Sequence, residues 1–256
     1  MSKLHDPKQN RLLAALHAAD YARLLPELKL ISMPLGQSVY EAGVAMDYVY
    51  FPTTCMVSLL YVMANGDSAE IAVVGNDGLV GVSVFMGGEG MSSRAVVQNA
   101  GECYRLKAKT MQREFARGGS LQYLALRFTQ ALIAQMVQTG ACNRHHTLEQ
   151  QLCRWLLLTL DRLPGNKVTM TQQLIGNMLG VRRSGVSEAT DSLEKNAVIS
   201  YNRGRITVLN RAKLEKRACE CYAAVKNEIK RLLAFEIPVN APVKPALANQ
   251  LALANH

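Results

Sequence analysis

The sequence predicts an α+β chain, with an antiparallel β domain first, a long apolar helix next, and a helix pair with a β-hairpin last. Short runs rich in Val, Ile and Tyr fill residues 30–107, and the apolar residues switch to a helical period from residue 121. The helix pair and the hairpin occupy residues 171–208. The 256 residues are enough for two modest domains, each with its own core.

Charge is distributed unevenly along the chain. Apolar residues make up 49% and charged residues 19%, which is ordinary for a folded globular protein. The formal charge is +9, and residues 144–233 carry 16 Lys and Arg against 8 Asp and Glu. A basic excess confined to one segment is typical of a module that binds a polyanion, although a solvated basic face has the same composition.

The cysteines predict neither a disulfide framework nor a metal site. Six are scattered along the chain, without the paired spacing of zinc ligands. His145 and His146, with Cys142 and Cys153, repeat no known ligand spacing, so we expect no metal and no cofactor.

The N-terminus and the hydropathy of the chain bear on its location. Charges interrupt the apolar positions of the first 25 residues, and no window reaches membrane-spanning length without charge. We therefore expect a cytoplasmic protein with reduced thiols. Cys219 and Cys221 stand two residues apart on a predicted helix and would point to different faces, one buried and one exposed.

The N-terminal half is predicted to begin with a helix and to continue as β structure. Asn10 fits as the N-cap of an amphipathic helix that Pro26 ends. Turn signals at residues 64–67 and 75–78 punctuate the β runs at the intervals of a sandwich or barrel. The runs are SVYEAG, DYVYF, MVSLLYVM, AEIAVVG, LVGVSVF, RAVVQ and ECYRL.

A long helix from Leu121 to Cys142 is predicted to carry two apolar stripes. One stripe can cover the β domain, whereas the second needs another partner, for which an identical helix of a second subunit is the economical choice. Full burial within one chain is the alternative. The first stripe holds Leu121, Leu124, Phe128, Leu132 and Met136, and the second holds Leu126, Ile133 and Val137.

The C-terminal third contains the most specific pattern. A helix from Thr147 to Leu163, ended by residues 164–166, precedes two helices that cross at a tight turn within residues 171–193. Gly176 is small where these helices approach, and Gly180 supplies the permissive backbone of the turn. Their shared interior is filled by Ile175, Leu179, Val181, Val186 and Leu193.

The polar residues of the helix pair are then free to contact DNA. The N-terminal turn of such a second helix reaches base edges in the major groove, and Arg183 is the best single candidate for bidentate readout of guanine. The residues expected to contact DNA are Thr171, Gln172, Arg182, Arg183, Ser184, Gly185, Ser187 and Glu188.

Residues 198–208 predict a β-hairpin, or wing, around an Asn-Arg-Gly turn. Arg203 and Arg205 flank Gly204, which we expect to be the residue with positive φ, and would lie at an exposed tip suited to phosphate contact. The wing directly follows the helix pair, and both lie in the basic third of the chain. Together they predict sequence-specific DNA binding.

This order of elements resembles the Crp/Fnr family of regulators from about Leu24 to Leu233. Residues 34–43 look like the opening turn of the family's cyclic-nucleotide-binding β-roll, residues 171–193 look like its recognition motif, and RGRITVLNRAKLE followed by ACECY resembles one bacterial branch. The resemblance implies a β-roll effector domain over 1–118, a dimerisation helix over 119–143 and a winged helix-turn-helix over 144–235. The tail, 236–256, is rich in Pro, Ala and Asn, and we expect it to be disordered.

The chain departs from the family pattern at the effector pocket. Members that bind cyclic AMP carry a glutamate for the ribose and an Arg-Ser pair for the phosphate. Here Gly81, Val82 and Ser83 offer no carboxylate, and the order of Ser93 and Arg94 is reversed. We therefore expect that cyclic AMP is not the effector. No cysteine precedes Cys55, so an iron-sulfur sensor of the N-terminal type is not expected.

The recognition helix also departs from the family. Members that read a GTGA-like half-site carry an Arg-Glu-x-x-x-Arg pattern, and only its first arginine is matched here, by Arg183.

The function predicted is a transcription regulator that binds a two-fold symmetric site as a homodimer, with RNA polymerase as a further partner and an unknown effector. An enzyme is not expected, because the sequence has no nucleophile-base signature, phosphate loop or paired carboxylates. The alternative is a small-molecule sensor that acts through a partner protein rather than through promoter recognition.

Overall fold

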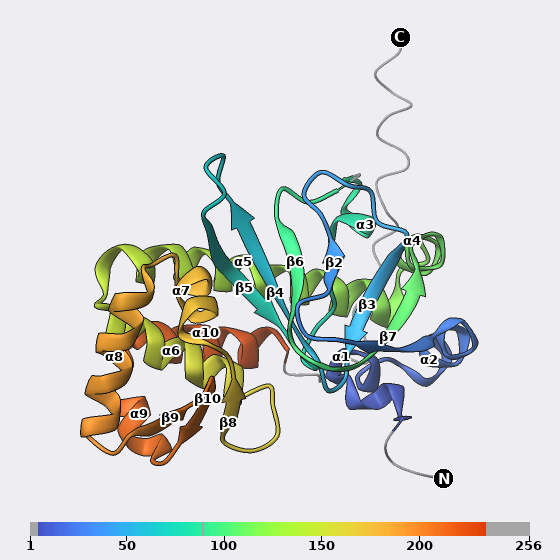
Figure 1. Ribbon diagram of the computed structural model, residues 1–256. Coiled ribbons are helices and arrows are strands. Elements are labelled where there is room, and N and C mark those ends of the chain that lie inside the picture. The colour runs from blue at the N-terminus through green and yellow to red at the C-terminus, as the bar shows by residue number, and fades with distance from the viewer. Residues whose placement is uncertain (1–4, 89, 234–256) are drawn as a thin grey trace.

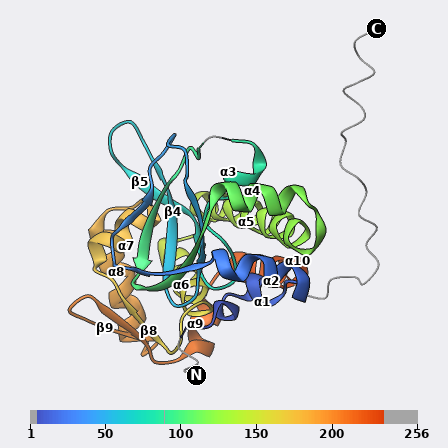
Figure 2. The same cartoon turned by 90° about the vertical axis from the view of Figure 1, so that its right-hand side faces the viewer.

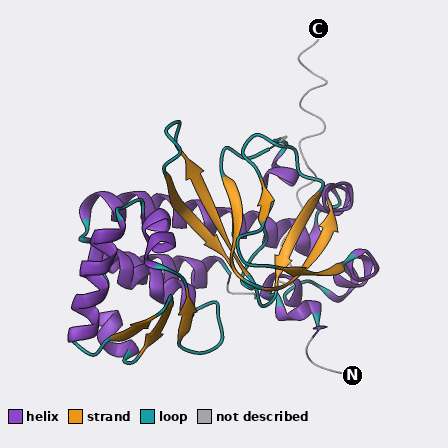
Figure 3. Cartoon of the chain, in the orientation of Figure 1, coloured by secondary structure: helices purple, strands orange, loops and turns teal. Residues whose placement is uncertain are grey.

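A computed structural model describes residues 5–88 and 90–233, and it divides the chain into two lobes joined by one long helix (Figure 1). The strands gather in two places, a large sandwich in the N-terminal lobe and a small sheet in the C-terminal lobe (Figure 3). The tail predicted to be disordered lies outside the described residues. No helix in the described part of the chain is long and apolar enough to cross a membrane.

The N-terminal segment is broken, not the single helix that the sequence predicts. Asn10 does cap the first α-helix, because its side-chain oxygen accepts from Leu12 N and Leu13 N, each at 3.1 Å. The helix nevertheless stops after one turn, and three residues separate it from the second helix. The segment consists of η2 (Pro7–Gln9), α1 (Arg11–Ala14), α2 (Ala18–Leu24) and η3 (Leu25–Glu27).

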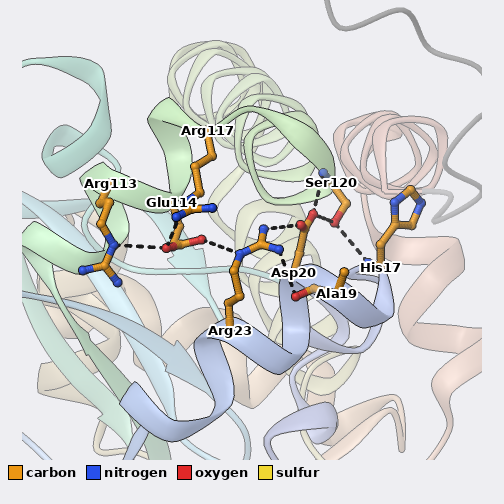
Figure 4. A network of polar contacts seen from close by, with 8 residues as sticks. All are labelled: His17, Ala19, Asp20, Arg23, Arg113, Glu114, Arg117 and Ser120. Atoms are coloured by element: carbon orange, nitrogen blue, oxygen red, sulfur yellow. Dashed lines mark hydrogen bonds and ion pairs between the residues drawn. The ribbon is translucent and has the colours of Figure 1, made fainter.

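Polar contacts with the N-terminus of the long helix explain this break (Figure 4). Ser120 donates from its backbone N, at 2.8 Å, and from its hydroxyl to the carboxylate of Asp20 on α2. The Ser120 hydroxyl also accepts from His17 N at 3.0 Å. These contacts tie α2 to a residue 100 positions away, a partner that a local helical pattern does not contain.

A buried carboxylate anchors the other side of α2 (Figure 4). Glu114 is 5% exposed, and Arg23 Nε donates to it at 2.9 Å while Arg113 Nε donates at 3.1 Å. Burial alone would raise the pKa of Glu114, but these charged hydrogen bonds hold the pKa below its ordinary value.

The β domain is an antiparallel sandwich, as predicted. One sheet has the order β1-β7-β3 and the other β2-β6-β4-β5, and their inner faces enclose a core that includes Phe51, Val57 and Leu106. In Figure 2 the strands stand in the centre, with α1, α2 and α4 on one side. The strands are β1 (Lys29–Met33), β2 (Ser38–Tyr40), β3 (Tyr48–Pro52), β4 (Met56–Val62), β5 (Ser68–Val74), β6 (Arg94–Asn99) and β7 (Gly101–Lys107).

Two details of this domain correct the sequence prediction. β1 was not among the predicted runs. The run LVGVSVF is not a strand: Val80 makes one bridge to Tyr50, and the chain then forms α3 (Ser83–Met86). Phe85 of α3 stacks on Phe115 of α4 (Ala108–Ala116), with ring centroids 4.8 Å apart, so tertiary packing overrides the β propensity of this run.

The long helix, α5 (Gly119–His145), has the two stripes that the sequence predicts. Leu121, Leu124, Phe128 and Leu132 are at most 5% exposed against the β domain. The residues of the second stripe are exposed to 50% at Leu126, 52% at Ile133 and 68% at Val137.

The C-terminal domain has its own core around Leu156, Ile175 and Leu193. The helix predicted from Thr147 to Leu163 is found at Leu148–Leu160 and so ends three residues earlier, with Thr147 and Gln150 forming a capping box at its start. The last helix returns to pack on α5. The elements are α6 (Leu148–Leu160), β8 (Lys167–Thr169), α7 (Gln172–Leu179), α8 (Arg183–Lys195), β9 (Ile199–Asn202), β10 (Arg205–Val208), α9 (Arg211–Arg217) and α10 (Glu220–Leu232).

Candidate nucleic-acid interface

Helices α7 and α8 meet at a sharp turn. α7 begins after Thr171, whose hydroxyl accepts from Leu174 N at 3.3 Å, and it ends at Gly180 with φ 67° and ψ 34°. A Cβ at Gly176 would lie 2.8 Å from the carbonyl oxygen of Val181, too close for a real side chain. The two glycines therefore have the predicted roles, close approach at one and a left-handed turn at the other.

The helix pair is held together from inside. Ile175, Val186 and Leu193 are fully buried between α6, α7 and α8. Gln172 on α7 donates through Nε2 to the hydroxyl of Thr190 on α8 at 3.1 Å. The predicted DNA contact Gln172 thus also fixes one helix against the other.

The N-terminus of α8 presents two unpaired cations. Arg182 is its N-cap and Arg183 its first residue, and both side chains are exposed. Within residues 5–88 and 90–233, neither guanidinium has a hydrogen-bond or ion-pair partner. The first turn contains no acidic residue, so the helix dipole and both guanidinium groups favour anions and hydrogen-bond acceptors at the same place.

The other predicted contacts on α8 differ in exposure. Ser184 and Glu188 are exposed, whereas Ser187 is half-buried. A Cβ at Gly185 would meet Leu148 Cδ2 at 2.8 Å, so this side of α8 faces α6.

The wing is a hairpin of β9 and β10, as the sequence predicts. Its register pairs Asn202 with Arg205, which leaves Arg203 and Gly204 as the two turn residues. Both have positive φ, 46° at Arg203 and 78° at Gly204, so the expectation that glycine alone takes this conformation is wrong. Two-residue hairpin turns of this kind match the twist of the strands, and they project both Arg203 and Arg205 as exposed side chains.

A third strand, which the sequence analysis missed, completes the wing. β8 pairs with β10, and Lys167 lies opposite Thr207. Lys167 and Arg205 line one shallow hollow on the outer face of this sheet, together with Arg203. The wing and α8 lie at the same end of the molecule (Figure 1). Lys167 is therefore a further candidate for backbone contact, and its three-residue strand gave no periodic signal.

Comparison with solved structures shows the same fold in bacterial regulators. FixK2 from Bradyrhizobium japonicum is 16% identical, with a TM-score of 0.63 over 75% of this chain and 98% of that chain. A CRP-family transcriptional regulator from Thermus thermophilus is 17% identical, with a TM-score of 0.62 over 74% of this chain and 96% of that one. CLP from Xanthomonas campestris, described as a c-di-GMP-responsive global regulator, is 14% identical, with a TM-score of 0.58 over 75% and 99% of the two chains.

Sequence models of domain families match both lobes. The Crp-like helix-turn-helix domain matches residues 150–217, and the cyclic nucleotide-binding domain matches residues 30–117. The chain belongs to the Crp/Fnr family. It is therefore a transcription regulator with a helix-turn-helix DNA-binding domain, and not an enzyme. A search of curated proteins found no match.

The β-roll of this Crp/Fnr regulator contains the five residues predicted for the effector pocket, and two of their polar side chains contact other residues of the β-roll. Val82 is 6% exposed within the apolar core. The Ser93 hydroxyl hydrogen-bonds to Tyr40 Oη at 3.2 Å, and Arg94 Nε forms an ion pair with Glu41 Oε1 at 3.2 Å.

Met46 occupies the space next to the same segment. Its thioether sulfur lies 3.9 Å from the hydroxyl of Ser83, and its terminal methyl carbon would lie 3.0 Å from a Cβ at Gly81. Gly81 has φ 106°, so the turn that begins the segment requires glycine.

A buried carboxylate links this β-roll to the DNA-binding domain. Glu70 of β5 accepts from Ser58 Oγ at 2.5 Å and from the indole Nε1 of Trp155 on α6 at 3.1 Å. Burial raises the pKa of Glu70 to about 7, although these hydrogen bonds and the charge of Arg154 oppose the rise. The protonation of Glu70 therefore changes near neutral pH at the contact between the two lobes.

The Glu70→Gln variant tests this link. Because folding raises the pKa of Glu70, protonated Glu70 stabilises the folded state fully at low pH. This stabilisation is lost as the pH rises through about 7. Wild type should lose up to about 3 kcal/mol of unfolding free energy relative to Glu70→Gln between pH 5 and pH 8, by urea denaturation at each pH.

The single tryptophan supplies an independent readout, since its indole donates to Glu70. Trp155 emission should titrate near pH 7 in wild type and not in Glu70→Gln. Equal pH profiles for the two proteins would show that Glu70 does not titrate in this range.

Proposed function

We propose that this regulator binds double-stranded DNA as a homodimer, with α8 of each subunit in the major groove of one half of a two-fold symmetric site. The observation that carries the proposal is the pair of exposed, unpaired guanidinium groups of Arg182 and Arg183 at the N-terminus of α8. In a helix-turn-helix this turn of the second helix reaches base edges, and arginine donates two hydrogen bonds to guanine O6 and N7.

The wing supports the same orientation by providing contacts to the DNA backbone. Arg203 and Arg205 project from the hairpin, and Lys167 adds a third cation on the neighbouring strand. Such contacts set the register on DNA without reading sequence, and each neutralised phosphate adds to the salt dependence of binding.

The exposed stripe of α5 supports the homodimer. Leu126, Gln130, Ile133 and Val137 are all exposed and follow a 4-3-4 spacing, which is the period of a coiled-coil seam. A face with this spacing can pair with the same face of a second copy, and two-fold pairing of the subunits would match a two-fold symmetric DNA site.

The proposal also places the protein in the cytoplasm, with RNA polymerase as a partner and without cyclic AMP as the effector. The last point is supported by the hydrogen bond between Ser93 and Tyr40, which engages a hydroxyl that a cyclic phosphate would need, and by the negative charge of Glu41 beside Arg94. A pocket without a ribose acceptor also loses charged hydrogen bonds worth about 1.5–3 kcal/mol.

Selection of bound DNA from a random pool tests the proposal as a whole. A regulator of promoters should enrich one defined, two-fold symmetric sequence. A sensor that acts through a partner protein would enrich none.

Substitution of Ile133 by Glu is expected to give monomers, because it would bury two like charges in the proposed seam. Leu35→Glu is the matched control, since Leu35 is also 52% exposed but lies in the turn between β1 and β2. Sedimentation velocity should show monomers for the first variant and dimers for the second. A dimer that persists in Ile133→Glu would rule out this face of α5 as the interface.

Arg183→Ala is expected to weaken binding to the selected site by about 1–3 kcal/mol and to relax the preference at one base position per half-site. Arg203→Ala should instead weaken all sequences alike and reduce the salt dependence. Lys109→Ala, exposed on α4 of the β domain, is the control. Fluorescence anisotropy at several salt concentrations measures these effects, and an equal loss on specific and random DNA for Arg183→Ala would contradict base reading.

Cyclic AMP is expected to bind at least tenfold more weakly than a pocket with the ribose carboxylate would allow, because Val82 replaces that acceptor. Isothermal calorimetry of the purified protein with cyclic AMP measures this directly. Micromolar binding that also raises DNA affinity would show that the pocket residues have been assigned wrongly.

A further inference from the structure

Three thiols and one imidazole lie close together where the C-terminus of α5 meets the N-terminus of α10. Cys142 and His146 lie on the last turn of α5 and at its C-cap, while Cys219 and Cys221 lie at the N-cap and in the first turn of α10. Cys142 Sγ is 3.5 Å from Cys219 Sγ, and Cys221 Sγ is 3.5 Å from His146 Nδ1. All four ligand atoms lie within 4.8 Å of one another.

The two distances of 3.5 Å match edges of one tetrahedron, and the remaining distances are at most 4.8 Å. Thiolate and imidazole ligands at about 2.3 and 2.0 Å from a zinc ion lie about 3.5–3.8 Å from each other. Ligands to different irons of a cluster would be spread more widely. The four atoms are thus close enough to surround one ion after small shifts of their side chains.

The backbone explains how Cys219 and Cys221 reach the same point. Their spacing in the sequence predicts that they diverge on one helix, with one of them exposed. Cys219 instead precedes the helix, with extended φ −75° and ψ 167°, and the two cysteines are 5% and 1% exposed. Cys142 and His146, four residues apart at the end of α5, share a helix face and meet them there.

The surrounding groups complete the site as zinc sites require. His146 contacts Glu220 Oε1 through Nε2 at 3.2 Å, which is the carboxylate–histidine arrangement that orients a metal-binding imidazole. Gln138 Nε2 lies 3.0 Å from Cys221 Sγ and can donate to a thiolate there. The N-terminus of α10 adds backbone dipoles that favour negative sulfur.

The charges around the cluster also favour a bound zinc ion. A Zn²⁺ ion with three thiolates and a neutral imidazole has a net charge of −1. The buried guanidinium of Arg154, 3% exposed, donates to Thr139 Oγ1 at 3.0 Å, one turn before Cys142, and its Nε has no hydrogen-bond partner in the described residues.

We propose that Cys142, His146, Cys219 and Cys221 bind one structural Zn²⁺ ion that fastens the end of α5 to the start of α10. Binding displaces the three thiol protons to solvent, so affinity rises with pH. All four positions of the tetrahedron are filled by the protein, which makes this a structural and not a catalytic site.

The test uses the purified full-length chain under reducing conditions. Elemental analysis should give about one zinc per chain. After chelation, added Co²⁺ should give the strong near-ultraviolet sulfur-to-cobalt absorption of a tetrahedral thiolate site, and Zn²⁺ should displace it. This spectrum reports coordination in the wild-type chain, so it does not depend on whether a variant folds.

Paired variants assign the ligands. His146→Ala and Cys219→Ala should each weaken Zn²⁺ binding at least about tenfold in chelator competition, and Glu220→Gln should weaken it less than either. His145→Ala, an exposed neighbour, and Cys153→Ala, a buried thiol outside the cluster, should leave affinity unchanged.

Three results would overturn the proposal. The first is a chain that takes up neither zinc nor cobalt at equimolar metal. The second is a Cys142–Cys219 disulfide as the main species of the reduced preparation by mass spectrometry. The third is iron with inorganic sulfide, which would indicate a cluster.

Discussion

The fold depends on how closely the loop at residues 75–78 packs against α5 and the turn that follows α6. Asp77 and Arg162 form an ion pair of 3.0 Å that is almost wholly buried. A Cβ at Gly75 would lie 2.9 Å from Cβ of Arg162, and one at Gly78 would overlap the ring of Phe128 on α5. A side chain at either position would collide with this neighbour, so both positions require glycine.

The same loop also holds the N-terminal segment. Asn76 accepts from Arg11 N at 2.7 Å, and Gly78 accepts from the side chain of Asn10 at 2.8 Å. Breaking a buried ion pair leaves an uncompensated charge and costs several kcal/mol, so Asp77 and Arg162 allow little variation in how the lobes meet. Residues 75–78 therefore set the relative positions of the sandwich, α5, the end of α6 and the N-terminal helices.

The sequence was sufficient where structure is set by neighbours along the chain. The turn at Gly180, the wing and the capped helix after Thr147 rest on short-range rules, and all three are found where they were predicted. It was insufficient where the partner is distant. β1 and β8 are short strands defined by the strands they pair with, and α3 exists because Phe85 packs on Phe115.

The same distinction holds for the candidate sites: those formed by neighbouring residues were predicted from the sequence, and those that depend on distant residues were not. Arg183 and the wing arginines follow from a motif that is contiguous in sequence. Lys167 was missed because its place on the wing depends on pairing with Thr207. The cysteine and histidine cluster joins residues 77 positions apart, a spacing that matches no metal motif, so only the folded chain brings its members together.

The path of the chain through the C-terminal domain limits how that domain can move. The chain leaves α5 at His146, and α10 then returns along α5 in the opposite direction, from Cys221 beside Gln138 to Leu232 beside Arg127. Arg127 donates to the carbonyl oxygens of Leu232 at 2.5 Å and Arg231 at 2.8 Å, where a cation suits the end of a helix. Because α10 packs along α5, a swing of the whole C-terminal domain, α10 included, about residues 146–147 would break that packing. Sliding of α10 along α5 would instead be a shear motion of small steps between packed side chains.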